Sequence, residues 1–144
     1  MPMIVVTGGD SFVPSGMNKV APVFQLSNVM TEVPGWTADP GSPGSTLSNN
    51  ALRNQGIKAA ATITANLVFS GAQSATTIQQ ARIFVNGNAV GNLASVTGAS
   101  GTLVCTATVP LADADLVTVQ ATGNATLGAW NAAIQVAGTT VRIT

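Results

Sequence analysis

Apolar and polar residues alternate along most of the chain from residue 57 onward. The longest alternating stretch places the following apolar residues on one face: Ile57, Ala59, Ala61, Ile63, Ala65, Leu67 and Phe69. A repeat of two residues is typical of a half-buried β-strand, whereas an amphipathic helix repeats every 3.6 residues. Shorter stretches with the same repeat occupy residues 81–85, 103–109, 117–121 and 134–143. We therefore predict strands at each of these places.

The connections between these stretches are rich in turn-forming residues. Asn86-Gly87 follows one predicted strand and favours a tight hairpin, because both residues tolerate positive φ. We find no helical pattern of useful length. Short strands separated by Gly, Asn and Asp turns are typical of two-layered β-folds. The sequence thus predicts an all-β protein, an antiparallel β-sandwich of the jelly-roll type.

The first third of the chain has a different character. Six of the seven prolines precede residue 45, and proline removes a ladder donor and fixes φ. We expect short extended pieces at residues 4–7 and 20–26, and a turn-rich loop at 34–45. The predicted organisation is an irregular N-terminal arm and loop region, 1–44, and a sandwich domain, 45–144. The arm would lie along the domain or a neighbour; an edge strand followed by a loop is the alternative.

The composition excludes several classes of function. The chain has no histidine and no tyrosine, and its five Lys and Arg balance its five Asp and Glu. A neutral chain lacks the basic stripe that a nucleic-acid partner requires. No apolar run approaches the roughly 18 residues of a membrane helix, so we expect no membrane partner. Aromatic residues make up only 4%, which indicates a thin core and favours an oligomer.

Candidate catalytic and metal-binding residues are few, and we expect no enzyme activity and no cofactor. Gly9-Asp10-Ser11 looks like the nucleophile block of GDS-type lipases, but a serine nucleophile of that kind needs a histidine base. Asp113 and Asp115 would be a weak calcium site, since calcium gathers six or more oxygens, and a turn explains them better. Cys105 falls on an apolar strand face, as a buried thiol does.

The two tryptophans are candidates for contact with a partner. Trp36 and Trp130 are interpreted as core or interface anchors, with sugar stacking on either ring as the alternative. Glu32 and Asp39 flank Trp36 and form a possible glycosidase pair, although nothing in the sequence fixes their separation. Arginine is favoured at interfaces, and Arg82 and Arg142 are therefore possible contact residues, with an exposed polar face as the alternative.

An ordered series of motifs resembles small virion proteins of actinobacterial tailed phages, of the head-decoration or minor-tail type. The series comprises GWTADPGSPGSTLSNNALRNQGIKAAATITANLVFSG, ARIFVNGNAVG, SGTLVCTATVPLADADLVTVQATG and TTVRIT, and covers about residues 29–144. These proteins look like C1q/TNF-type jelly rolls, which assemble as trimers through flat apolar faces. The resemblance implies a homotrimer in which Phe84 and the Ala/Thr-rich strand faces line the threefold contact.

The resemblance also implies a function and a location. It suggests a non-enzymatic capsid decoration protein on the virion surface, whose partners are its own copies and the major capsid protein or tail proteins. The N-terminal arm would dock on the lattice. The alternatives are a minor tail protein, or a carbohydrate-binding module in which Trp36, Glu32 and Asp39 attach the particle to a host glycan.

Overall fold

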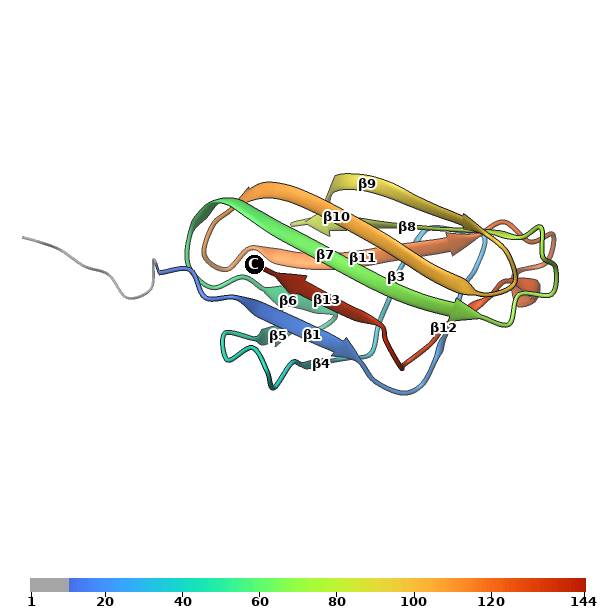
Figure 1. Cartoon of the computed structure of the whole chain (residues 1–144), viewed down its shortest axis with the longest axis horizontal. Helices are drawn as coiled ribbons and strands as arrows, with labels where there is room; N and C mark the ends of the chain where they lie inside the picture. The colour runs from blue at the N-terminus through green and yellow to red at the C-terminus, as the bar shows by residue number, and fades with distance from the viewer. Residues whose placement is uncertain (1–10) are drawn as a thin grey trace, which may run out of the picture.

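The chain folds into two antiparallel β-sheets packed face to face (Figure 1). The structure is a computed structural model and describes residues 11–144. The described residues contain a single turn of 3-10 helix, η2 (Gly128–Trp130), and no helix long and apolar enough to cross a membrane. The prediction of an all-β, jelly-roll sandwich is confirmed.

The first sheet is built around the longest strand. In spatial order it contains β10 (Gly101–Leu111), β7 (Lys58–Ser70), β13 (Thr140–Ile143), β1 (Ser15–Lys19) and β4 (Trp36–Ala38). The short strands β12 (Ala133–Ile134) and β2 (Phe24–Gln25) continue this sheet beside the end of β7. Figure 1 shows β7 and β10 running side by side along the sandwich.

The second sheet covers the other side of the core. Its spatial order is β9 (Asn88–Thr97), β8 (Ile78–Val85), β11 (Leu116–Gly123), β6 (Ala51–Arg53) and β5 (Thr46–Ser48). The two-residue strand β3 (Thr31–Glu32) pairs with Gln120 and Ala121, toward the C-terminal end of β11. The β8–β9 hairpin turns at Asn86-Gly87, and both residues have positive φ, as predicted.

The core lies between the inward faces of the two sheets and consists mainly of aliphatic side chains. Leu67 of β7 lies opposite Leu103 of β10, and both are fully buried. In the second sheet the equivalent buried pair is Ile83 of β8 and Val119 of β11. Burial on one face of each strand explains why the apolar residues recur at every second position.

The predicted inward face of the longest strand is correct from Ala61 to Phe69 but wrong for Ile57 and Ala59. Ile57 is 56% exposed, and Ala59 is also exposed. The reason is a β-bulge: Val109 pairs with Ala61, but Leu111 pairs with Lys58, which leaves one extra residue in β7. An extra residue reverses the alternation beyond it, so the apolar repeat no longer points inward.

Residues 11–44, which belong to the predicted arm and loop region, supply four strands to the two sheets. β1 lies inside the first sheet, hydrogen-bonded to β13 on one side and to β4 on the other. The prolines of this region fall between the strands, so the ladders stay intact. This segment thus contains more regular structure than the prolines predicted. The extended piece predicted at 4–7, and the part of the arm over residues 1–10, lie outside the described residues.

A side chain from β9 covers part of the free edge of β10. Gly91 has a φ of +72° and causes an irregularity in the β8–β9 ladder between Ala81 and Ile83. The next residue, Asn92, accepts a hydrogen bond from the Thr106 backbone N–H (2.7 Å) and donates one to the Val104 carbonyl (3.2 Å). The amide of Asn92 thereby satisfies backbone groups that an edge strand otherwise leaves open.

Candidate functional site

The outward side of β7 and β10 is an uncharged surface over the two longest strands. We call it the β7–β10 face and define it by the outward side chains Thr62, Thr64, Asn66 and Val68 of β7 and Thr102, Val104, Thr106 and Thr108 of β10. Their positions alternate with the buried positions of the same strands, and the register brings them together in cross-strand pairs such as Val104 with Asn66. The two strands thus present one continuous surface.

The β7–β10 face combines methyl groups with hydroxyl and amide groups and carries no charged side chain. Val104 lies near its centre and is 48% exposed. Burying such a surface removes no ionised group from water, which is the most costly part of desolvation. Depletion of charge is also the compositional mark of the centre of a protein–protein interface.

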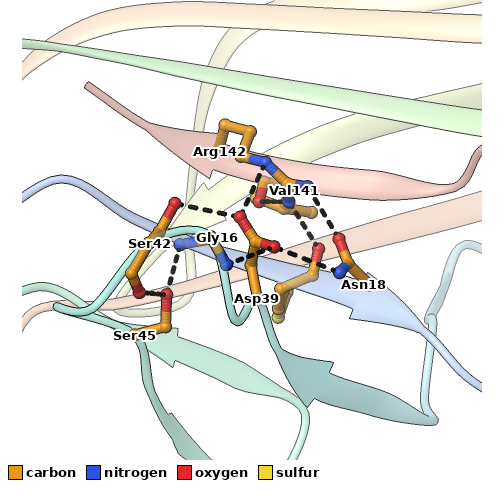
Figure 2. A network of polar contacts seen from close by, with 9 residues as sticks. Gly16, Asn18, Asp39, Ser42, Ser45, Val141 and Arg142 are labelled. Carbon is orange, nitrogen blue, oxygen red and sulfur yellow. Dashed lines mark hydrogen bonds and ion pairs between the residues drawn. The ribbon is translucent and has the colours of Figure 1, made fainter.

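The polar network around Arg142 borders this face (Figure 2). Arg142 of β13 lies beside Thr64 of β7, and its guanidinium donates to the Met17 carbonyl (3.1 Å) and to Asn18 Oδ1 (2.8 Å). Its Nε lies 3.5 Å from Asp39 Oδ2. A Cβ at Gly16 would lie 2.7 Å from the Arg142 side chain, so the absence of a side chain there lets the arginine lie across β1. The predicted interface residue Arg142 is therefore largely engaged within its own subunit.

The Asp39 carboxylate organises the loop that follows β4. It accepts hydrogen bonds from the Gly41 backbone N–H (3.2 Å), the Ser42 hydroxyl (2.9 Å) and the Asn18 amide (3.4 Å). The hydrogen bond from Gly41, followed by that from Ser42, holds the pKa of Asp39 below its ordinary value, with the Arg142 charge a smaller cause. Asp39 thus has a structural role in shaping this loop.

Two other predicted contact residues, Arg82 and Phe84, lie on the second sheet. Both are half-buried on the outward side of β8, where Phe84 pairs with Thr118 of β11. The Arg82 guanidinium donates to the Gly91 carbonyl (3.1 Å), which ties it to the irregular part of β9. The structure therefore does not bring Phe84 and Arg82 together with Arg142.

Trp36 is a core residue. It is 9% exposed, and its indole N–H donates to the Val33 carbonyl (2.7 Å). Glu32 is in β3 of the second sheet, whereas Asp39 follows β4 of the first sheet. The predicted sugar site formed by these three residues is not assembled, because a buried ring offers no face for stacking.

Trp130 belongs to η2 at one end of the sandwich and is 41% exposed. Trp130 lines a polar pocket together with residues of the β7–β8 loop and of the segment after β11. From the sequence, both tryptophans have the same interpretation, as core or interface residues. The fold shows that Trp36 is buried and Trp130 is exposed.

The remaining candidates have structural roles. Asp113 accepts a hydrogen bond from the Gly56 N–H (2.9 Å), and Asp115 accepts one from the Ala112 N–H (2.8 Å), as expected of turn residues. No group of three potential metal ligands occurs in the part of the chain that the structure describes. Cys105 is fully buried, and burial raises the pKa of its thiol to about 11. Of the lipase-like triplet, Gly9 and Asp10 lie outside the described residues, and Ser11 forms an isolated bridge with Ile57.

Comparison with known proteins identifies the fold. No protein-family model and no curated protein matches this chain. Among solved structures, the Eiger TNF of S. frugiperda is similar, with a TM-score of 0.59, 9% identity, and coverage of 92% of this chain and 90% of that one. The crystal structure of murine APRIL at pH 5.0 is also similar, with a TM-score of 0.61 and 15% identity. The match covers 92% of this chain and 98% of APRIL. Its structure at pH 8.0 has the same TM-score and 14% identity. At these identities the similarity concerns the fold alone, which is a TNF-like jelly roll.

Proposed function

We propose that this chain is a non-enzymatic structural protein that assembles as a homotrimer and decorates the capsid of a phage. The observation that carries the self-association is the β7–β10 face, a continuous surface without charged side chains over the two longest strands. The absence of histidine from the sequence and the engagement of Asp39, Asp113 and Asp115 in turns support a role without catalysis.

The threefold assembly has two kinds of support. The sequence resembles virion proteins of the C1q/TNF type, for which trimers are expected, and the fold is similar to that of Eiger TNF and APRIL. A threefold contact joins two different patches of each subunit, because the contact is heterologous. We assign the β7–β10 face as one patch and the surface around Phe84 on the second sheet as the other.

A matched pair of Val→Lys substitutions tests this assembly. Val104 is 48% exposed at the centre of the β7–β10 face, and Val29 is 70% exposed in the loop before β3. Because the contact is heterologous, Val104→Lys would bury one unpaired charge at each of the three interfaces and should convert the trimer into monomers. Val29→Lys adds the same charge elsewhere and should leave the trimer intact. Light scattering coupled to size exclusion measures both masses.

The outcomes separate the two patches. A wild-type monomer at micromolar concentration would refute the trimer, and a trimeric Val104→Lys would exclude the β7–β10 face. Phe84→Ser should weaken the trimer if the second patch is correct. If the Phe84→Ser variant remains a trimer, the second patch does not include Phe84, and the assignment of the β7–β10 face still stands.

The phage location rests on the sequence resemblance. A trimer bound at a lattice junction would add buried contacts to the shell and stabilise it by mass action. Quantitative mass spectrometry of purified particles tests this location. Hundreds of copies in a simple ratio to the major capsid protein would support decoration. A handful, in a multiple of three, would favour the minor tail alternative, and no copies would refute both.

A further inference from the structure

The pocket beside Trp130 is a feature that the structural role does not use. It encloses about 280 Å³ at the end of the sandwich. Its lining residues include three with hydroxyl groups (Ser74, Thr76 and Thr126), two with amide groups (Gln73 and Asn124), and Trp130. A volume near the lower end of the usual range of roughly 300–1,000 Å³ suits a compact ligand.

The chemistry of this wall defines the kind of ligand. A half-exposed indole offers a flat apolar face, and hydroxyls and amides both donate and accept hydrogen bonds. None of the lining residues is charged, so the site has nothing to pair with a phosphate, a carboxylate or an ammonium group. We propose that this pocket binds a neutral saccharide, with one sugar ring stacked on Trp130.

The framework around the pocket is held rigidly by hydrogen bonds. The Gln73 backbone N–H donates to the Trp130 carbonyl (3.0 Å), which joins the β7–β8 loop to η2. Asn131, which is 1% exposed, accepts from the Ala125 N–H (2.8 Å) and donates to Asn28 Oδ1 (2.7 Å). A site that is already ordered loses less conformational entropy on binding.

Polar atoms remain available to a ligand. Asn124 Oδ1 accepts the Ile78 backbone N–H (2.7 Å), and this bond fixes the orientation of the amide. The Asn124 amide nitrogen and the Trp130 indole nitrogen have no hydrogen-bond partner within residues 11–144. Both are donors, and sugar hydroxyl and ring oxygens accept such bonds.

A second depression adjoins the first at Asn124. It encloses about 330 Å³, and its wall includes Gln80 and Thr122 of the second sheet. Its lining is also uncharged. Because Asn124 lines both depressions, an oligosaccharide can occupy the two together, and we expect it to bind more tightly than a monosaccharide.

The test begins with the purified full chain on immobilised neutral oligosaccharides of glucose, galactose, mannose and N-acetylglucosamine. Sialylated and sulfated forms of the same chains are included. The tightest neutral oligosaccharide is then titrated in solution and followed by tryptophan fluorescence. Trp36 is buried, so a bound sugar should protect Trp130 selectively from quenching by acrylamide.

Three variants locate the site. Trp130→Ala should weaken binding by at least about tenfold, since stacking on the ring is lost, and Trp130→Phe should weaken it less. Leu127→Ala, a 52% exposed neighbour outside the pocket wall, should bind as the wild type does. In Trp130→Ala the emission of Trp36 alone reports whether the core is intact.

Each other outcome overturns the proposal. No binding to any neutral oligosaccharide excludes a saccharide site, and binding only to the sialylated or sulfated forms excludes a neutral ligand. Unchanged affinity in a folded Trp130→Ala variant would show that the saccharide binds at another place on the protein. These results do not depend on the trimer, because Trp130 lies at the end of the sandwich and outside the β7–β10 face.

Discussion

Asn131→Ala tests how strongly one buried amide holds the end of the sandwich together. Asn131 is 1% exposed, and its side chain forms two short hydrogen bonds, from the Ala125 N–H (2.8 Å) and to Asn28 Oδ1 (2.7 Å). Each bond contributes about 1 kcal/mol net, and an amide left unpaired in a partly buried site costs roughly 1–3 kcal/mol more. We therefore expect the variant to lower the free energy of unfolding by about 3–5 kcal/mol.

Asn124→Ala is the matched control for this substitution. The same change at Asn124, an exposed residue, removes one hydrogen bond, from the Ile78 N–H (2.7 Å), and should cost about 0.5–1.5 kcal/mol. Urea unfolding followed by circular dichroism at one fixed protein concentration measures both, because association contributes to apparent stability. If Asn131→Ala costs no more than Asn124→Ala, the amide of Asn131 does not anchor this region and the reasoning is wrong.

Three further outcomes are expected. Leu103→Ala should lower the free energy of unfolding by roughly 2–5 kcal/mol, because Leu103 is fully buried against Leu67; a loss below about 1 kcal/mol in urea unfolding would contradict this packing. Cys105 should resist thiol reagents at pH 8 until the chain unfolds, since burial raises its pKa to about 11, and rapid labelling of the native protein would contradict its burial. Asp39→Asn should destabilise the protein above about pH 4, and the loss of stability should become smaller as the pH falls. The lowered pKa of Asp39 means that the folded state stabilises the ionised carboxylate, and this stabilisation is lost when the group is protonated. Melting temperatures of both proteins between pH 2 and 7 test this, and a difference that is independent of pH would refute it.

The strands that were predicted correctly are those with one buried and one solvent-facing side. β7, β8, β10 and β11 have this property, and their sequences carry the repeat of two. β9 was missed because it is an edge strand in which only Ala94 is buried, so its sequence shows no apolar repeat. β1 was missed for the opposite reason: Ser15, Gly16 and Met17 are all buried, and polar or small residues there do not alternate with apolar ones.

The candidate sites were harder to predict, because they depend on which surfaces the topology exposes. The alternation correctly placed Arg82 and Phe84 on the outward side of β8. The sequence did not distinguish Trp36 from Trp130, since both lie among Gly, Asn and Asp residues outside the longer strands. The bulge after Lys58 also left no signal, because Ala59, Ala60 and Ala61 suit either face. The role of Asn131 depends on contacts with Asn28, which is distant in the sequence.

The hydrogen bonds from Asn92 to β10 also bear on solubility. With zero net charge, electrostatic repulsion does little to keep copies of this protein apart at high concentration. An open strand edge would then recruit the edges of other copies and grow into fibres without limit. Asn92 occupies the Val104 and Thr106 backbone groups that such growth would use. The Asn92 amide thus hinders the addition of a further strand along this part of the β10 edge.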